Sequence, residues 1–349
     1  MAIKVLLRMK CVGALGLLAA CGQAAPSHER SNQRTATVAN DSLDTYIGSP
    51  ADAVSNSSEW YIADAEQDAV FSYSLGGVRR RRIGRRGSGP GELKTPTAVG
   101  TRGDRIYVAD LGNRRITIFS RDGAYISARN MPRDCFGSSA AGIRANDDAV
   151  FVLLKCRLNA GEIELRVVEL LADDSFSVVL VDTARSQNRA LSPVAFPLFD
   201  ANADYLVLGD GQAKCLKLLR IRESRKLEPL CVSRATRTRL SPTSIARLQK
   251  NSRGLLEVPS MLPVGLAVTL HNQQLYFLHP VSEVRSEWLS VPILTPHAIP
   301  VRVTAPLAQR SYFDGSTLLT FSGEAGGYIP RISTQELPSD FAARSKDRI

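Results

Sequence analysis

The sequence predicts an all-β fold, a six-bladed β-propeller with four-stranded antiparallel blades, and three observations support this prediction. Residues 60–77, WYIADAEQDAVFSYSLGG, align without a gap on residues 106–123, IYVADLGNRRITIFSRDG, at a constant offset of 46. A unit of that length holds four short strands and has the size of one propeller blade. Segments comparable to the YVAD strand recur further along the chain, so that six such strands are expected in all.

The N-terminal segment has the layout of a secretory signal. Lys4, Arg8 and Lys10 form a positively charged start, and the apolar run CVGALGLLAAC follows them. The run is too short to be a permanent membrane-spanning helix. Its end, the sequence LAAC, resembles a bacterial lipobox, which implies cleavage after residue 20 and diacylation of Cys21. We therefore expect a signal peptide over residues 1–20 and a membrane anchor that carries fatty acyl chains such as palmitate.

The expected localisation and domain organisation follow from that signal. A lipoprotein belongs to the bacterial cell envelope, and a glycine at residue 22 favours the outer membrane, facing the periplasm or the surface, if the organism is Gram-negative. Residues 21–44 are polar and predict a flexible tether. Residues 45–340 then form the propeller, and residues 341–349 form a polar tail. Removal of the signal lowers the formal net charge from +10 to +7.

Each copy of the repeat is expected to form two strands joined by a short polar turn. Asp64 and Asp110 end the first strand of each copy, where a carboxylate accepts hydrogen bonds from the backbone of the following turn. Gly77 and Gly123 close the copies at a position where a hairpin commonly needs positive φ. A catalytic role for the two aspartates is the weaker alternative, because they belong to the repeat itself.

The second copy and its lead-in resemble an NHL repeat. The stretch GSGPGELKTPTAVGTRGDRIYVADLGNRRITIFSRDG carries the GxGPGx(F/L) lead-in, a proline that opens the inner strand, the YVAD strand, GNxRI and a DG turn. The match is specific over residues 84–123 and partial over residues 60–77. The resemblance implies a six-bladed propeller, which agrees with the length of the repeat.

The later blades are predicted from pattern alone. The segment LSPTSIARLQKNSRG has an N-cap serine, a proline at the first helical position and a terminating glycine, so a short helical insertion is expected near residues 241–253. The last blade runs out of chain, and we expect residues 35–38 to complete it and close the ring. The strands comparable to YVAD are expected at residues 150–154, 205–209, 275–279 and 317–321.

Four cysteines remain besides Cys11 of the signal and the lipid site Cys21. Four cysteines allow three pairings. Cys215 and Cys231 are equidistant from the turn-like RESR, and Cys135 and Cys156 are equidistant from RANDD. Residues equidistant from a hairpin turn face each other. Two local disulfides are therefore expected, and a metal site is not, because no CxxC or neighbouring histidine accompanies these cysteines.

An arginine run follows the first copy of the repeat. In the predicted layout it forms the outermost strand of a blade, where arginines keep their stems packed and their heads in water, and so discourage edge-to-edge association. A site for anions of the envelope, such as lipid phosphates, acidic glycans or acidic proteins, is the alternative, whereas nucleic acid is not expected in that compartment. The residues concerned are Arg79, Arg80, Arg81, Arg82, Arg85 and Arg86.

No catalytic constellation is recognisable in the sequence. GSGPGE resembles a phosphate loop, but no Lys-Ser/Thr follows it and no helix opens there, so it predicts a crossover between blades. The histidines have no ligand spacing, and GxSxG is missing. The histidines are His28 in the tether, His271 in the turn before a predicted strand, His279 at the far end of that strand, and His297 in a loop.

Two function hypotheses remain from the sequence. The first is a non-catalytic, membrane-anchored propeller that binds a protein or glycan and needs no cofactor. The second is a propeller hydrolase or lyase, because propellers similar to this one include metal-dependent lactonases, an amidating lyase and a streptogramin lyase. Their chemistry requires carboxylates, amides or histidines that converge on the central channel, so the lining of that channel distinguishes the two hypotheses.

Overall fold

The computed structural model describes residues 34–37 and most of residues 47–334. Within the second range it leaves out residues 57, 133–138, 158–162, 174, 185–196, 211–214, 223–226, 233–238, 240, 244–245, 247–265, 272, 283–284, 295–300, 307–310, 314–316 and 325–326. All described strands belong to one structural unit that begins at residue 33. The signal peptide, Cys21, His28, His297 and the polar tail lie outside the described residues.

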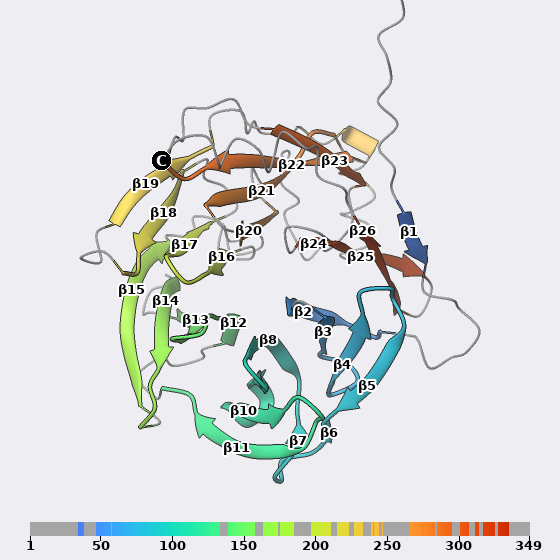
Figure 1. Cartoon of the computed structure of the whole chain (residues 1–349), viewed down its shortest axis with the longest axis vertical. Coiled ribbons are helices and arrows are strands. Elements are labelled where there is room, and N and C mark those ends of the chain that lie inside the picture. The colour runs from blue at the N-terminus through green and yellow to red at the C-terminus, as the bar shows by residue number, and fades with distance from the viewer. Residues whose placement is uncertain are drawn as a thin grey trace, which may run out of the picture. The chain divides into compact units, whose positions relative to one another are not determined.

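Five four-stranded antiparallel sheets are each built from consecutive strands (Figure 1). From the inner to the outer strand, the first two are β2 (Pro50–Asn56), β3 (Glu59–Asp64), β4 (Ala69–Ser74) and β5 (Arg79–Ile83), and β8 (Pro96–Arg102), β9 (Arg105–Asp110), β10 (Arg115–Ser120) and β11 (Tyr125–Asn130). The next is β12 (Ser139–Ala145), β13 (Val150–Arg157), β14 (Ile163–Leu170) and β15 (Phe176–Ala184). Then come β16 (Pro197–Ala201), β17 (Tyr205–Asp210), β18 (Cys215–Arg220) and β19 (Leu227–Cys231), and finally β20 (Ala267–His271), β21 (Gln274–Pro280), β22 (Arg285–Pro292) and β23 (Val301–Pro306).

A further four-stranded sheet combines the two ends of the described chain. Its strands are β24 (Ser311–Phe313), β25 (Thr317–Glu324), β26 (Gly327–Thr334) and, on the outside, β1 (Arg34–Thr37). β1 pairs antiparallel with β26, with Arg34 opposite Thr334. The segment expected to complete the last blade therefore pairs there. Because β1 pairs with the outer edge of β26, the first described strand covers the edge of the last one.

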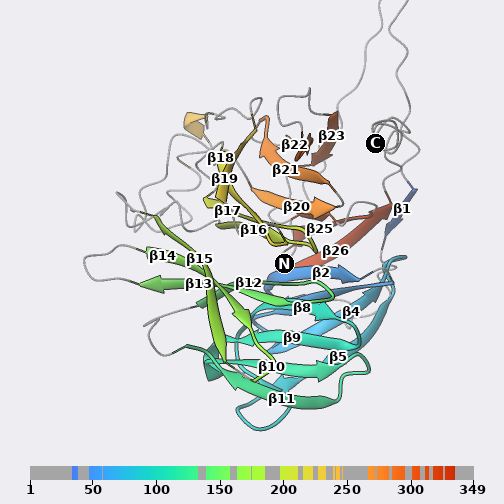
Figure 2. The same ribbon diagram turned by 60° about the vertical axis from the view of Figure 1, so that its left-hand side comes forward.

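The sheets are arranged around a common centre, which makes this unit an all-β propeller (Figures 1 and 2). Helix is scarce among the described residues, as expected for this class. Of the insertion predicted near residues 241–253, the described residues Pro242, Thr243 and Ala246 are helical, and the rest lies outside the described part of the chain. The four strands predicted from pattern coincide with β13, β17, β21 and β25, each of which lies next to the innermost strand of its sheet.

The 46-residue repeat is visible as two superimposable hairpins. β3 and β4 correspond to β9 and β10, and the turn residues Asp68 and Arg114, which occupy equivalent positions, both have positive φ, 51° and 55°. Gly77 and Gly123 have φ values of 82° and 95°, so the expectation of left-handed backbone at these glycines is confirmed. Equal backbone geometry at equal offsets shows that the repeat in the sequence is a structural repeat.

The core lies between neighbouring sheets. β3 illustrates this, because its central residues are apolar in succession rather than in alternation. All six residues of β3 are buried. Trp60 and Ile62 pack toward Leu319 and Phe321 of β25. Because successive side chains of a strand point to opposite faces, Tyr61 packs toward β8 and β9 on the other side. A blade of this ring is covered on both faces, and β3 therefore carries apolar residues at four consecutive positions, 60–63.

The GSGPGE segment is a crossover between sheets, as predicted. It contains a short parallel pair, β6 (Arg85–Arg86) with β7 (Glu92–Leu93), between β5 and β8. Three glycines in and beside the crossover have positive φ, and Arg115 donates hydrogen bonds to the carbonyl oxygens of Ser88, Gly89 and Glu92. The segment is organised by internal contacts, which agrees with a structural role.

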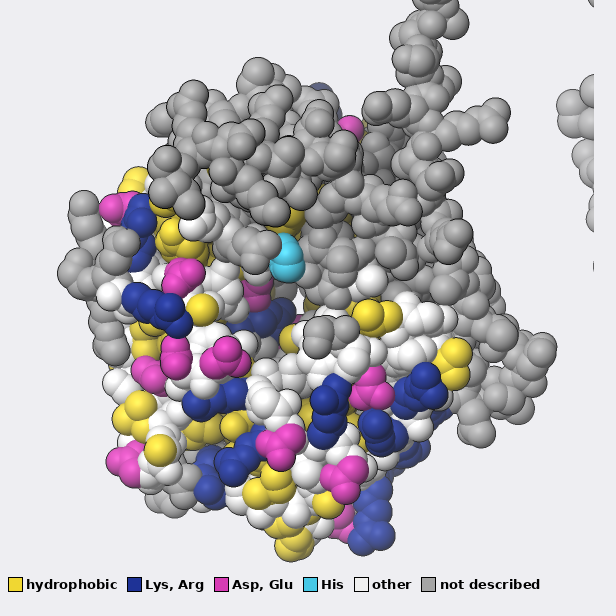
Figure 3. Space-filling view, in the orientation of Figure 1, with side chains coloured by type: hydrophobic (Ala, Val, Ile, Leu, Met, Phe, Trp, Pro, Cys, Tyr) yellow, Lys and Arg dark blue, Asp and Glu magenta, His cyan; other side chains and the backbone are white. Residues whose placement is uncertain are grey.

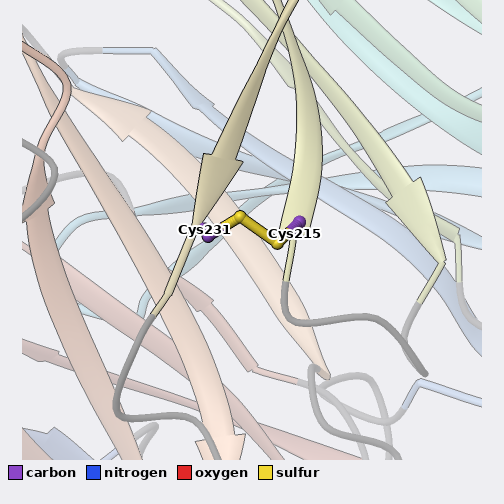
Figure 4. The surroundings of a disulfide bond; sticks show 2 residues. All are labelled: Cys215 and Cys231. Carbon is purple, nitrogen blue, oxygen red and sulfur yellow. A yellow bond between two sulfur atoms is a disulfide. The ribbon is translucent and has the colours of Figure 1, made fainter.

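One of the two predicted disulfides is confirmed. Cys215 and Cys231 lie directly opposite each other on β18 and β19 and are joined (Figure 4). Cys156 on β13 is also disulfide-bonded, but Cys135, its expected partner, lies outside the described residues. The described residues form no helix that is long and apolar enough to cross a membrane.

Candidate functional site in the central channel

The central channel is lined by the innermost strand of each sheet. These strands are β2, β8, β12, β16, β20 and β24, and consecutive ones contact each other around the centre (Figure 1). In a strand, every second side chain points to the same face, so a few side chains from each inner strand approach the channel. The residues that meet there decide what chemistry the channel supports.

Arg144 of β12 lies between two carboxylates from other sheets. Its Nη1 lies 3.1 Å from Oδ2 of Asp52 on β2, and its Nε lies 3.0 Å from Oδ1 of Asp200 on β16. The Arg144 side chain is 15% exposed, and those of Asp52 and Asp200 are 6% and 10% exposed. The three residues therefore form a buried ionic contact across the channel, which we call the channel bridge.

Both aspartates of the channel bridge also accept backbone hydrogen bonds from the next inner strand. Asp52 Oδ2 accepts from the N–H of Val99 on β8 at 3.2 Å, and Asp200 Oδ2 accepts from the N–H of Leu270 on β20 at 2.6 Å. Through these contacts the channel bridge connects five of the inner strands. Its carboxylate oxygens are thus occupied by a guanidinium and by main-chain donors.

The electrostatics of the channel bridge favour a charged arginine. Burial opposes the charge of Arg144, but the negative charges of Asp52 and Asp200, with a smaller contribution from Tyr312 on β24, raise the pKa of the guanidinium above its usual value. Burial also raises the pKa of Asp200, and Arg144 offsets this only in part. Since guanidinium neither gives up nor takes a proton near neutral pH, Arg144 offsets part of the negative charge of the two carboxylates rather than serving as an acid or base.

No motif in the sequence marks the channel bridge. Asp52, Arg144 and Asp200 stand 92 and 56 residues apart, and none belongs to a motif. RANDD was interpreted as a turn, whereas Arg144 is part of β12 and the turn runs over residues 146–149, closed by the N–H of Asn146 to the carbonyl of Ala149. An arginine on a strand amid apolar residues was the one available hint.

Asp64 supports the backbone around it, as expected. It is completely buried. Its carboxylate accepts hydrogen bonds from the N–H groups of Glu66 and Gln67 in the following turn, and from those of Gly48 and Ser49 before β2. Four backbone donors leave this group committed to structure.

Asp110 is buried as well, but its partners differ from those of Asp64. It accepts from the N–H of Lys94, from Nδ2 of Asn113 and from Nε of Arg115. The partner in the following turn is therefore a side chain rather than the backbone. Asp110 joins the GNxRI segment to the strand entry that precedes β8.

The histidines within the described residues are separated. His271 is the last residue of β20, rather than part of the turn where it was expected, and pairs opposite Gln274. His279 is buried on β21, beyond Leu278, which pairs with the first residue of β20. The described residues contain no group of three or more His, Cys, Asp or Glu side chains placed to hold a metal ion.

The arginine run forms the outermost strand β5, as predicted, and continues into the crossover strand β6 (Figure 1). Arg81 pairs with Glu59, Arg85 with Glu92 and Arg86 with Asp68. The hydrogen bonds from Gly89 N–H and the nearby Arg85 hold the pKa of Glu92 below its usual value. Figure 3 shows Lys and Arg side chains gathered at the lower right of this face. The remaining three of the run are Arg79, Arg80 and Arg82.

The fold and its channel define a β-propeller protein. No family model and no curated protein matches the chain. Solved propeller structures similar to it include a luciferin-regenerating enzyme, with a TM-score of 0.55, 11% identity and coverage of 87% of this chain and 96% of that one. A protein from Bacteroides fragilis described as exported has a TM-score of 0.52 and 11% identity, over 87% of this chain and 95% of that one. Regucalcin from Agrobacterium tumefaciens, a calcium-binding protein, has a TM-score of 0.52 and 10% identity, over 83% and 91%.

These structural similarities, at 10–11% sequence identity, establish the fold. The activity has to be argued from the channel. The similar structures are a protein described as exported, an enzyme and a calcium-binding protein. One propeller fold therefore carries different functions. What distinguishes this chain is therefore the composition of its channel and its rim.

Proposed function

We propose that this chain is a six-bladed, lipid-anchored β-propeller of the bacterial cell envelope that acts by binding a partner rather than by catalysis. Six four-stranded sheets among the described strands support the blade count, and the resemblance of residues 84–123 to an NHL repeat supports the same number. The charged start, apolar run and LAAC sequence support export and acylation at Cys21. The likeness to a protein described as exported agrees with that location.

The observation that carries the non-catalytic assignment is the channel bridge. Propeller hydrolases and lyases need channel groups that are open to substrate or cation. Here the carboxylates of Asp52 and Asp200 are buried, paired with Arg144 and hydrogen-bonded to backbone N–H groups. The guanidinium does not exchange its protons near neutral pH. The carboxylate oxygens of Asp52 and Asp200 are already engaged by Arg144 and by backbone N–H groups, so the channel bridge serves as a plug that joins the blades.

The experiment compares binding with catalysis in the purified mature protein. The N-terminal peptide is analysed by mass spectrometry for acyl chains on Cys21, bound metal is quantified, and lactone and ester hydrolysis is assayed with and without a chelator. We expect an acylated N-terminus, no turnover, and a saturable partner in envelope extract whose binding a chelator does not alter. Stoichiometric divalent metal together with chelator-sensitive turnover would contradict the non-catalytic assignment.

A matched pair of variants sharpens this test. Arg144→Met removes the cation of the channel bridge, whereas Arg144→Met combined with Asp52→Asn and Asp200→Asn restores a neutral channel. If the channel is only structural, partner binding by both variants follows the fraction of folded protein. A variant that stays folded but loses all partner binding would instead place the binding site in the channel.

A further inference from the structure

We infer that the arginine rim, defined as Arg79, Arg80 and Arg82 of β5, binds the anionic headgroups of a phospholipid bilayer, so that the propeller lies with its edge on the membrane. The inference rests on the proposed lipid anchor, since it names the membrane surface as a second contact of the anchored chain. It explains a feature that blade stability alone leaves unexplained: among the described residues, these three arginines have no carboxylate partner.

The first argument is the charge of the rim. Arg81, Arg85 and Arg86 each have a carboxylate partner. Among the described residues, by contrast, Arg79, Arg80 and Arg82 have no such partner. Arg82 donates to the carbonyl oxygen of Gln67, and Arg79 lies 4.0 Å from the ring centroid of Phe71. The rim therefore carries three positive charges that no nearby acid neutralises.

The second argument is the way the side chains are supported. The guanidinium of Arg82 lies 5.6 Å from the centroid of Phe71, on the ring that Arg79 also covers. The two guanidinium groups are thereby held against one aromatic ring, with Arg82 exposed and Arg79 half-buried. Arg80 lies at an irregularity in the pairing of β4 with β5 and is exposed. A supported, outward-facing set of guanidinium groups suits phosphate, which accepts two parallel hydrogen bonds from one arginine.

The third argument is the position of the rim relative to the chain's entry into the fold. Phe71 packs in one cluster with Leu319 and Phe321 of β25, so Arg79 and Arg82 lie on the side of β5 toward the sheet that contains β1. β1 and β5 are the outermost strands of neighbouring sheets and lie on the same side of the ring in both views (Figures 1 and 2). The first described strand of the chain, β1, therefore lies in the sheet next to the arginine rim.

The length of the tether makes this proximity consequential. Twelve residues separate Cys21 from Arg34, the first residue of β1. Fully extended they span at most about 40 Å, and a flexible chain of that length averages roughly 20 Å. An acylated Cys21 thus keeps the rim within reach of the headgroups, where each arginine adds to the attraction. Contact through an outer strand leaves both channel mouths accessible to a partner.

Vesicle binding by a chain without acyl groups tests the inference. The chain from residue 22 onward retains every described strand, all of which belong to the unit that begins at residue 33. It is mixed with phosphatidylcholine vesicles that contain or lack phosphatidylglycerol, and the bound fraction is measured by co-sedimentation. We expect binding only to the anionic vesicles, with affinity that falls steeply between about 0.1 and about 0.5 M salt.

Two double variants of equal charge locate the contact. Arg80→Gln/Arg82→Gln removes two rim charges, and Arg105→Gln/Arg222→Gln removes two exposed charges from other sheets. Because an arginine near an anionic surface contributes about fivefold in affinity, the rim variant should lose about 30-fold and the control less than about threefold. Unfolding curves establish that both variants are folded.

Three outcomes of the vesicle assay would overturn the inference. These are equal losses in the two double variants, equal binding to neutral and anionic vesicles, or no binding by the wild-type chain. Binding of poly-glutamate in place of vesicles would point to an acidic protein as the occupant, and would also overturn it. Since the assay uses a chain without acyl groups, its failure leaves the lipid anchor standing, and acylation at Cys21 is decided separately by mass spectrometry.

Discussion

Trp60 donates a hydrogen bond from its indole Nε1 to the hydroxyl Oγ1 of Thr317 at 3.2 Å, although 257 residues separate the two in sequence. Trp60 belongs to β3 and Thr317 begins β25, so the bond joins the first sheet of the chain to the last one. Both residues are buried. The contact adds a side-chain connection to the strand pairing of β1 with β26 at the same junction.

Loss of this hydrogen bond should lower the free energy of unfolding. Trp60→Phe removes the donor and some packing volume, and we expect a loss of about 2–3 kcal/mol, of which about 1 kcal/mol belongs to the hydrogen bond. Thr317→Val should cost about 1 kcal/mol. Urea unfolding of both single variants and the double variant measures the coupling, and strictly additive losses would show that the bond contributes nothing.

The closing strand should be essential for a stable ring. A chain that begins at residue 39 lacks β1 and leaves the edge of β26 unpaired. We expect a lower unfolding midpoint and concentration-dependent self-association, because an open strand edge pairs with other chains. Thermal unfolding and sedimentation velocity provide the measurement, with a chain that begins at residue 33 as the control. Equal behaviour of the two chains would mean that β1 is dispensable.

Removal of the cation from the channel bridge should destabilise the fold. Arg144→Met leaves Asp52 and Asp200 buried without their counter-charge, and breaking a buried pair in this way costs about 3–5 kcal/mol. Adding Asp52→Asn and Asp200→Asn should recover most of that loss, since the amide oxygens keep the backbone N–H partners. Chemical unfolding checks the order of the three stabilities. A triple variant less stable than Arg144→Met would contradict the explanation by charge.

Alkaline pH should weaken the protein through Tyr73. Burial raises the pKa of Tyr73 from 10.0 to about 12, against a smaller opposing effect of Arg79. Because the pKa is higher in the folded than in the unfolded chain, the stabilisation is complete below pH 10 and is lost as the pH rises through about 12. A shift of that size corresponds to roughly 2–3 kcal/mol.

Tyr73→Phe is the variant that assigns this alkaline transition. It should flatten the fall in unfolding free energy above pH 10, although Tyr61 and Tyr276, whose pKa values burial also raises, will keep part of the slope. Ultraviolet absorbance of tyrosinate follows the ionisation directly. The assignment would be wrong if the variant retained the full wild-type slope.

Several elements could be predicted because their signals are local. The 46-residue offset located two hairpins. The glycines at residues 77 and 123 marked positions of positive φ, which glycine adopts without strain. Equal distance from a turn placed Cys215 opposite Cys231. The arginine run was assigned to an outer strand because repeated charge is incompatible with the buried middle of a blade. Each of these features can be recognised within a single hairpin or strand.

The channel could not be predicted because its members come from separate sheets. Asp52 and Asp200 are single acids in otherwise apolar strands, and Arg144 was assigned to a turn. The direction of each side chain depends on the register of its strand, which is shifted by irregularities in β2 and β12. A shift of one residue moves a side chain to the opposite face, so local pattern does not say which residues enter the channel.

The sequence by itself determined the type of element, the repeat, the hairpin disulfide and the charged outer strand, because hydrophobic period, turn residues and spacing act over short distances. Only the tertiary structure decided that Arg144 meets Asp52 and Asp200. Closing the ring brings together residues that the chain separates by many tens of positions. Charge pairing at its centre is therefore a property of the assembled sheets and not of any one segment.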